Sequence, residues 1–269
     1  MASEFDKKQP IAWMTVKGVH IPIFEGETSN EALERVKSSY KQKMNKGDYI
    51  SFGKDEDEAY EEAYDFFHQL DASSHDEWIE DLTNDERSEI LLYTEEDGSY
   101  TYINKDLYKK GYDGLDESTR KQVDTLDSMI DKFELYSPIQ CTRLSDLRML
   151  GLDKGQMPSD ADPKAFKQQI KNKLQETYGY IEYPSYLSSS ADDIGRPVEH
   201  SNLMVHIGVP AGQGSGAYLG DENLNPDMAE ENEYLFARNS VLKYDINSLK
   251  QDSYGRWVIW AEWVGKADD

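Results

Sequence analysis

The chain of 269 residues is long enough for one large domain or two small ones with a buried core. Its formal net charge of −24 at pH 7 repels phosphate backbones and anionic lipid, which argues against direct binding to nucleic acid or to a membrane surface. The same charge favours a protein partner with a basic surface.

The N-terminus and the cysteine content bear on where the protein works. Residues 1–10 lack the apolar core of a signal peptide, and no stretch reaches the roughly 20 apolar residues that span a bilayer. Cys141, the one cysteine, cannot form an internal disulfide and has no Cys or His partners at metal-binding spacing. We therefore expect a soluble protein without its own export signal, in a reducing compartment such as the cytoplasm, and no metal site.

The N-terminal quarter of the chain predicts a short β segment followed by helices. Residues that favour β-structure, interrupted by a glycine and a proline, predict an extended arm or hairpin over residues 10–26. Apolar residues then recur at intervals of three and four, which predicts helices over residues 29–47 and 56–70. We assign residues 1–28 to an N-terminal arm. Residues 29–75 are either accessory helices or extra helices on the same core.

Further helices are expected before residue 136. The run 83–86, Thr-Asn-Asp-Glu, is a capping-box pattern, so a helix is expected to begin there. Apolar periodicity predicts another helix over residues 100–110, ended by Gly111, and a longer one over residues 117–134. Up to this point the chain is mainly helical.

The second half changes to short apolar runs separated by turn residues, which predicts β-strands. The predicted strands are residues 139–144, 178–187, 203–209, 217–219, 234–237, 241–246 and 256–264. The last run is rich in aromatic residues and is expected to be a central strand, and one helix near residues 163–178 interrupts the series. Helices first and strands afterwards predict an α+β fold, with N-terminal helices packed on a two-sheet, mainly antiparallel β core.

Several familiar site patterns do not fit this chain. The Gly-rich run 210–216 lacks the Gly-Lys-Ser/Thr of a phosphate loop, and the acidic run 153–162 lacks the glycine and glutamate of a calcium loop. The five histidines show no metal-binding spacing. We interpret these features as a hairpin turn, a solvated loop and structural histidines.

Three polar elements, each on or beside a predicted strand, remain as candidates. They are Arg143, the run Ser188-Ser189-Ser190, and the run Glu231-Asn232-Glu233. Each alone is a weak signal. A spacing of two residues is expected to put both glutamates on the same face at the mouth of a strand, which suits paired acid and base chemistry.

On these motifs the chain resembles the ADP-ribosyltransferase exoenzyme family, which includes the enzymatic components of clostridial binary toxins and the Rho-modifying exoenzymes. The matching pieces are Trp78, Leu82-Thr83, Glu86, Ile90, Tyr93-Thr94, the run 102–107 Tyr-Ile-Asn-Lys-Asp-Leu, the run 186–190, the runs 204–210 and 216–219, and the run 231–238. The resemblance implies a transferase domain over residues 29–269 with NAD as its substrate.

The resemblance also implies roles for the polar elements. Arg143 would hold the diphosphate of NAD, and Arg196 would add a phosphate and nicotinamide contact. Ser188 would orient Glu233, and Glu233 would hold the nicotinamide-ribose hydroxyl and stabilise the oxocarbenium ion left as nicotinamide departs. Glu231 would take the proton of a target guanidinium, because glutamate at this place goes with arginine targets and glutamine with asparagine targets. Arg143 and Ser188 are thus expected to serve both catalysis and NAD binding.

Two departures from the family pattern bear on NAD binding. Tyr108 stands where the family has an arginine, so Lys109 or Lys110 would have to replace one phosphate contact. Asn104, in the same run, is a further expected NAD contact. Around Arg143 the commoner aromatic and glycine neighbours are missing, and Arg148 is the fallback.

These features predict an NAD-dependent mono-ADP-ribosyltransferase that modifies an exposed arginine on a target protein. The loop 220–230 is the expected target-recognition element, and its acidity either fits a basic target or only reflects the acidity of exposed loops here. Two alternatives stay open: an NAD glycohydrolase of the same fold, and an inactive copy that serves as a structural or interaction module. Residues 13–23 weakly resemble segments of phage head-associated proteins, which suggests delivery into a host cell in a virion.

Overall fold

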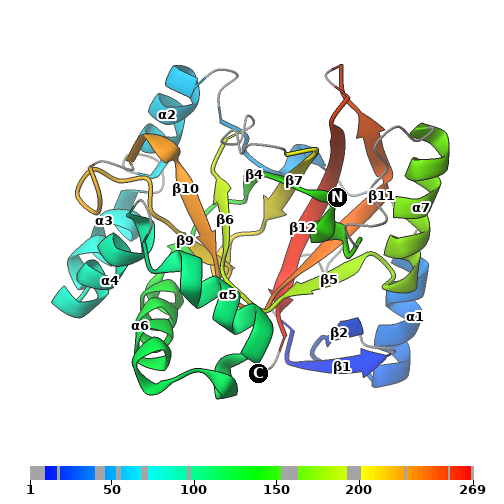
Figure 1. The fold of residues 1–269 in the computed structure, drawn as a ribbon, viewed down its shortest axis with the longest axis horizontal. Coiled ribbons are helices and arrows are strands. Elements are labelled where there is room, and N and C mark those ends of the chain that lie inside the picture. Colours follow the sequence, from blue (N-terminus) through cyan, green and yellow to red (C-terminus); the bar gives the residue numbers. More distant parts are fainter. Residues whose placement is uncertain are drawn as a thin grey trace.

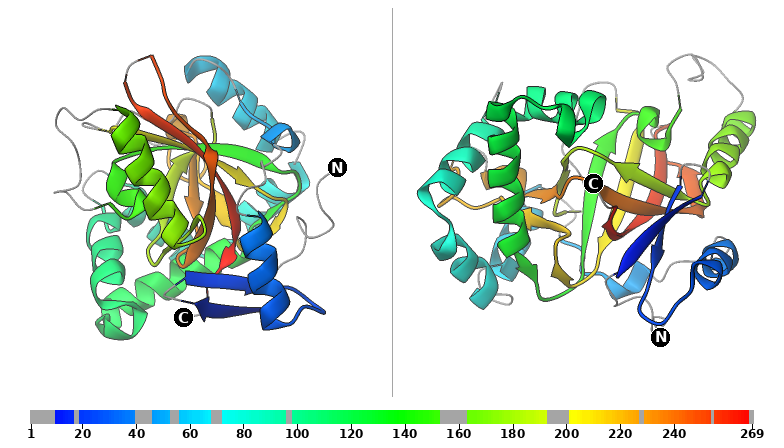
Figure 2. Two further views of the ribbon diagram at one scale, coloured as in Figure 1. Left: turned by 90° about the vertical axis from the view of Figure 1, so that its right-hand side faces the viewer. Right: turned by 90° about the horizontal axis from the view of Figure 1, so that it is seen from below.

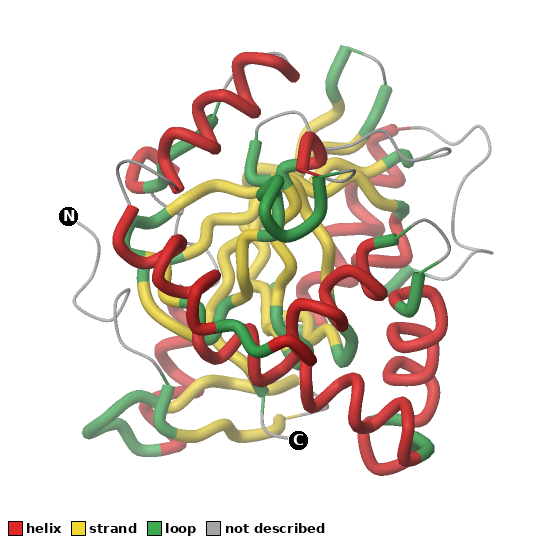
Figure 3. The backbone as a smooth tube through the Cα atoms, turned by 90° about the vertical axis from the view of Figure 1, so that its left-hand side faces the viewer, coloured by secondary structure: helices red, strands yellow, loops and turns green. Residues whose placement is uncertain are grey.

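The computed structural model describes residues 10–16, 19–39, 46–52, 56–67, 72–95, 98–152, 163–192, 201–226, 229–253 and 255–267. These residues form an α+β domain whose helices lie outside a central, mainly antiparallel sheet (Figure 3). The predicted fold class is confirmed. In these ranges no helix is both long enough and apolar enough to cross a membrane.

Most of the helices are those expected from the sequence. Their bounds are α1 Ser29–Ser39, α2 Glu56–Asp65, α3 Ala72–Asp81, α4 Asn84–Thr94, α5 Tyr100–Lys110, α6 Glu117–Lys132 and α7 Pro163–Glu176. The predicted capping box starts α4, because Thr83 and Glu86 each accept a hydrogen bond from the other's backbone N–H. Gly111, with φ +66°, ends α5 as predicted. The sequence pattern does not predict α3.

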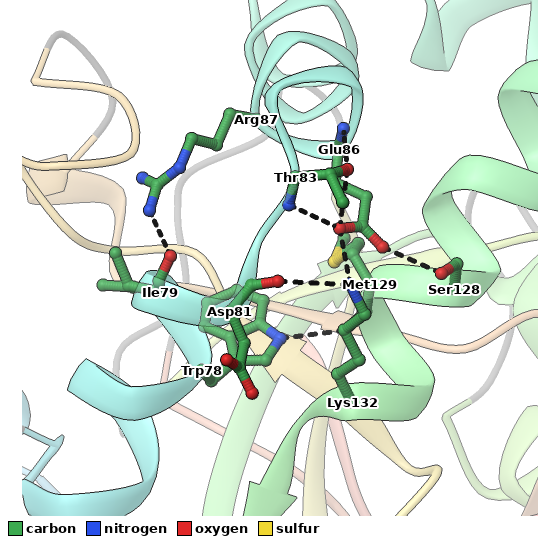
Figure 4. Close-up of polar contacts among 9 residues, drawn as sticks. All are labelled: Trp78, Ile79, Asp81, Thr83, Glu86, Arg87, Ser128, Met129 and Lys132. Carbon is green, nitrogen blue, oxygen red and sulfur yellow. Dashed lines mark hydrogen bonds and ion pairs between the residues drawn. The ribbon is translucent and has the colours of Figure 1, made fainter.

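Side-chain contacts join α3, α4 and α6 into one unit (Figure 4). Lys132 Nζ lies 2.7 Å from Glu86 Oε2, and the Ser128 hydroxyl donates to Glu86 Oε1 over 2.8 Å. From α3, the indole N–H of Trp78 donates to a backbone carbonyl of α6 over 2.9 Å. Burial raises the pKa of Glu86, but hydrogen bonds from Lys132 and from the Thr83 backbone more than offset this and lower it to about 2.

The strands follow the predicted order with different bounds. They are β1 Ala12–Val16, β2 Val19–Ile23, β3 Glu134–Leu135, β4 Ile139–Ser145, β5 Tyr180–Tyr183, β6 Leu187–Ser190, β7 Leu203–Val209, β8 Gly212–Gln213, β9 Gly216–Tyr218, β10 Glu233–Phe236, β11 Ser240–Gln251 and β12 Trp257–Lys266. The run 178–187, expected as one strand, contributes to two. Pro184 interrupts it, because proline has no N–H to donate to a neighbouring strand.

Within the described residues, eight strands form one sheet in the order β5-β11-β12-β7-β4-β6-β10-β9 (Figure 1). Strands β12 and β7 are parallel, and the other neighbours are antiparallel. One residue pair, Thr142–Ser190, joins β4 to β6. The sheet is therefore divided at this junction into two parts, which correspond to the two-sheet core that was expected.

Different helices cover the two parts of the sheet. Helix α6 packs on β9 and on α4, whereas α7 packs on β11. Residues of the predicted arm form the hairpin β1–β2, which lies beside α1 at one end of the domain (Figure 2). Ile21 of the hairpin and Val36 of α1 share an apolar cluster with Tyr180 of β5. Phe66 and Phe67, directly after α2, belong to the main core.

Candidate active site

The serine run and the second glutamate lie on neighbouring antiparallel strands, β6 and β10. In the register of this pair, Glu233 is opposite Ser190 and Leu235 is opposite Ser188. Ser188 and Glu233 therefore lie on the same face of the sheet, diagonal to one another. The side chain of Ser188 is hydrogen-bonded to the carboxylate of Glu233.

The surroundings of Glu233 favour its protonated form. Burial raises the pKa of Glu233, and the hydrogen bond from Ser188 opposes that rise. The negative charge of Glu231 raises the pKa further, and the positive charge of Arg143 lowers it. The net result is a pKa of about 7, so at neutral pH the carboxylate is divided between its protonated and ionised forms. Raised carboxylate pKa values of this size are typical of active sites.

Glu231 is placed differently from the prediction. It ends a short 3₁₀ turn, Ala229–Glu231, and the strand begins only at Glu233. Between them Asn232 has φ +50°, a left-handed conformation that asparagine tolerates better than most residues. The expectation that a two-residue spacing puts both glutamates on one strand face is therefore wrong. Glu231 nevertheless lies close enough for its charge to act on Glu233.

Arg143 of β4 reaches across the junction between the two parts of the sheet. One terminal nitrogen of its guanidinium donates to the backbone carbonyl of Ser188 on β6. Its buried Nε has no hydrogen-bond partner among the described residues. Arg148, the fallback, is exposed and pairs with its near neighbour Asp146. Of these two arginines, it is Arg143 that lies within electrostatic range of Glu233.

Three tyrosines, two of them buried and one half-buried, lie within electrostatic range of Arg143, and the sequence pattern predicts no role for them. Burial, and after it the negative charge of Glu233, raise the pKa of the Tyr93 hydroxyl, so Tyr93 is a neighbour of that carboxylate. The hydroxyls of Tyr183 and Tyr244 are 2.6 Å apart, and both tyrosines lie within electrostatic range of Arg143. Tyr93 belongs to the stretch that resembles the family, whereas no sequence signal separates Tyr183 and Tyr244 from ordinary core residues, because tyrosine is common in cores.

Of the other described residues predicted to bind NAD, only Asn104 contacts the group formed by Glu233, Ser188, Arg143 and the tyrosines. Asn104 of α5 donates to the Tyr93 hydroxyl over 2.9 Å, and its buried Oδ1 has no hydrogen-bond partner in the part of the chain that is described. Lys109 is exposed on α5, and no contact joins it to the glutamates among the described residues. Tyr108 is 75 % exposed. Arg196 lies outside the described residues.

The cluster suits a ligand that carries both phosphate and ribose. Among the described residues, Nε of Arg143 and Oδ1 of Asn104 are buried polar atoms without a hydrogen-bond partner, which is the kind of atom that a bound ligand can satisfy. The carboxylate of Glu233 can accept hydrogen bonds from sugar hydroxyls and stabilise a positive charge nearby. No group of three or more His, Cys, Asp or Glu side chains within the described ranges is placed to hold a metal ion.

Comparison with known families gives both the class of this protein, a transferase that uses NAD, and its particular family. Residues 68–264 match the model of the ADP-ribosyltransferase exoenzyme family, and the chain belongs to that family. The family resemblance seen in the sequence is confirmed, as is NAD as the substrate that donates ADP-ribose. A search of curated proteins gave no match.

Solved structures of similar fold include several ADP-ribosyltransferase toxins. Plx2a from Paenibacillus larvae is 20 % identical, with a TM-score of 0.63 over 77 % of this chain and 96 % of that chain. The C3 exoenzyme of Clostridium limosum is 19 % identical, with a TM-score of 0.60 over 81 % and 98 %. C3stau2 of S. aureus, solved with NAD, is 18 % identical, with a TM-score of 0.61 over 81 % and 100 %. At these identities the likeness concerns the fold.

Proposed function

We propose that this protein transfers ADP-ribose from NAD to the side chain of an arginine on another protein and releases nicotinamide. The observation that supports this best is the pair of carboxylates with unequal surroundings. Glu233 is hydrogen-bonded and has a pKa of about 7, whereas Glu231 ends a turn beside it. Two carboxylates in different environments suit two separate tasks.

The first task is cleavage of NAD. The bond between C1′ of the ribose and the ring nitrogen of nicotinamide breaks, and its electron pair leaves with nicotinamide. The ribose is left with the positive charge of an oxocarbenium ion, which ionised Glu233 stabilises. Ser188 holds the carboxylate in place by its hydrogen bond. Arg143 offers a fixed positive charge for the diphosphate.

The second task is activation of the acceptor. A guanidinium has a pKa above about 12 and is a poor nucleophile until a base removes a proton. Glu231 takes that proton, and the guanidine nitrogen forms its bond to C1′ of the ribose. The same site with water as the acceptor would hydrolyse NAD, so loss of Glu231 is expected to stop transfer and to leave hydrolysis.

Further parts of the site follow from the family pattern. Asn104 contributes its buried amide to NAD binding, in line with its unpaired oxygen. Lys109 and Arg196 add positive charge near the diphosphate. We take residues 29–269 as the transferase domain, because Ala32 and Val36 of α1 share a buried cluster with Tyr180 and Val241 of the central sheet.

The partner is a target protein with an exposed arginine in a basic surface. The exposed Glu222 supports this, because it puts negative charge on the loop that leads to the catalytic pair. Delivery into a host cell, in a virion, is the route suggested by the resemblance of residues 13–23 to phage head-associated segments.

The test is transfer of label from NAD tagged on its adenine into host-cell lysate, with mass spectrometry to locate the modified residue. The proposal predicts ADP-ribose on arginine with the wild type. Glu233→Gln is expected to abolish both labelling and nicotinamide release, and Glu231→Gln to abolish labelling alone. Label on a residue other than arginine would refute the proposed specificity. Release of nicotinamide without labelling in any lysate would favour the glycohydrolase.

A further inference from the structure

A buried histidine on α3 contacts the chain segment that leads to the two glutamates. His75 is fully buried. It lies among the rings of Phe67, Trp78, Phe133 and Tyr218. The segment in question is the connection from β9 to β10, residues 219–232, with Glu231 at its end. The catalytic steps proposed above make no use of this histidine.

One ring nitrogen of His75 faces an oxygen atom of Tyr218, the last residue of β9, and the other faces an oxygen atom of Asp221 in the connection. Its Nε2 lies 3.3 Å from the backbone carbonyl oxygen of Tyr218, and its Nδ1 lies 3.5 Å from Oδ2 of Asp221. A carbonyl oxygen and a carboxylate oxygen can both accept hydrogen bonds, so a ring N–H of His75 can donate to either of them. His75 therefore stands between two acceptors, one at the end of β9 and one on the side chain of Asp221.

Asp221 organises the first half of the connection. Its Oδ1 accepts from the backbone N–H of Asn223 over 2.6 Å. Its backbone carbonyl accepts from the N–H groups of Leu224 and Asn225, each over 3.0 Å. The side chain of Asn225 in turn donates to the hydroxyl of Thr94 at the end of α4, over 2.8 Å. The inner side of this turn is thus held against the helices.

Tyr218 links the same histidine to the second half of the connection. Its hydroxyl donates to Oδ1 of Asn232 over 2.9 Å, and Asn232 stands between the two glutamates with its left-handed backbone. A side chain at Gly220 would lie 2.7 Å from the Tyr218 hydroxyl and 2.9 Å from Cα of Asn232. The connection is therefore tightly closed at this point.

We propose that His75 is a positioning residue, which through Asp221 and Tyr218 holds the β9–β10 connection so that Glu231 stays beside Glu233. This inference rests on the proposed function, since it assigns His75 to the acceptor step that Glu231 serves. Helix α3, which carries His75, is itself fixed to α6 by the Trp78 hydrogen bond (Figure 4). Because α3 is fixed in this way, the contacts of His75 hold the connection that ends at Glu231 in place.

The test compares the wild type with His75→Phe, which keeps a ring of similar size in the aromatic surroundings but removes both polar contacts. The matched control is Glu77→Gln, a change at an exposed residue of the same helix. Hydrogen exchange of residues 219–233 measures the anchoring. The ratio of ADP-ribosylated agmatine formed to NAD hydrolysed measures the acceptor step, because agmatine offers a free guanidinium.

We expect His75→Phe to speed hydrogen exchange in residues 219–233 by about tenfold or more. We also expect it to lower the ratio of agmatine transfer to hydrolysis about fivefold or more, with NAD hydrolysis within about threefold of the wild type. Glu77→Gln should match the wild type in both. Unchanged exchange, or an equal fall in transfer and hydrolysis, would overturn the proposal.

Two further results separate this inference from the proposed function. If the wild type hydrolyses NAD but does not modify agmatine, the arginine assignment fails and hydrogen exchange alone decides the role of His75. If His75→Phe does not fold, Asp221→Asn replaces it. The asparagine keeps an oxygen that can accept from the N–H of Asn223, but it has an amide NH₂ in place of the second carboxylate oxygen, which faces His75. Asp221→Asn should also speed hydrogen exchange in residues 219–233. Exchange at the wild-type rate in Asp221→Asn would overturn the proposal.

Discussion

The side chain of Ser188 on β6 is hydrogen-bonded to the carboxylate of Glu233 on the neighbouring strand β10. This bond favours the ionised carboxylate, while burial and the charge of Glu231 favour the protonated one. The balance leaves the pKa of Glu233 at about 7. Small changes in these surroundings should therefore alter the fraction of active enzyme near neutral pH.

Ser188→Ala should move the pH dependence of NAD cleavage to higher pH. Loss of the hydrogen bond raises the pKa of Glu233, and a hydrogen bond to a charged group is worth about 1.5 kcal/mol or more, or roughly one pKa unit. The ionised fraction of Glu233 at pH 7 then falls from about one half to about one tenth, so nicotinamide release at pH 7 is expected to fall about fivefold and to recover in part at alkaline pH. The control is Ser189→Ala, because the buried Ser189 hydroxyl has no hydrogen-bond partner among the described residues. Equal pH midpoints for Ser188→Ala and the wild type would contradict this role.

Glu231→Gln should move the pH dependence of NAD hydrolysis in the opposite direction. The negative charge of Glu231 raises the pKa of Glu233, so its removal lowers that pKa and the active ionised form appears at lower pH. Transfer to agmatine should be lost at every pH, because the base is missing. Initial rates between pH 5 and 9 measure both effects. Glu222→Gln, at an exposed loop residue, is the control. If Glu231→Gln hydrolyses NAD with the same pH midpoint as the wild type, the charge of Glu231 does not act on Glu233.

Glu233→Gln should stabilise the folded protein above neutral pH. The pKa of Glu233 is raised from 4.5 to about 7 by folding, so the folded state binds this proton more tightly and loses stability as pH rises between these values. At pH 8 the variant is expected to gain about 2 kcal/mol in the free energy of unfolding, with little gain below pH 4.5. Urea unfolding at pH 4.5 and pH 8 measures the difference. A variant less stable than the wild type at pH 8 would contradict this account of burial.

Glu86→Gln, in contrast, should destabilise the folded protein at neutral pH. Folding lowers the pKa of Glu86 to about 2, so its contribution is present above pH 4.5 and is lost as pH falls towards 2. The variant is expected to lose about 2 kcal/mol at pH 7 and to approach the wild type in acid. Urea unfolding measures this loss, with Glu80→Gln at an exposed position of α3 as the control. If Glu86→Gln and Glu80→Gln lose the same free energy of unfolding at pH 7, the contacts of Glu86 with Lys132 and Ser128 do not stabilise the fold.

Elements with strong local signals could be predicted from the sequence. The capping box fixes the start of α4 and Gly111 fixes the end of α5, because both act within a few residues of the chain. Helix α3 could not be predicted in this way. Its buried face includes a polar residue, His75, whose partners come from residues far along the chain.

The candidate site was predictable in its residues more than in its geometry. The family motif pointed to Ser188 and Glu233, and the structure places them in contact. The prediction that Glu231 and Glu233 share one strand face was wrong, because the left-handed backbone of Asn232 interrupts the alternation of side chains along the strand. The three tyrosines near Arg143 come from α4, β5 and β11, and no local pattern predicts that these elements meet beside β4.

The most direct test of the central claim is nicotinamide release from NAD by purified wild type, Glu233→Gln and Glu231→Gln, each verified as folded by circular dichroism. We expect release by the wild type, a fall of about 10²-fold or more in Glu233→Gln, and retained hydrolysis in Glu231→Gln. Wild-type rates in Glu233→Gln, or no release by the wild type, would contradict the claim that this cluster cleaves NAD.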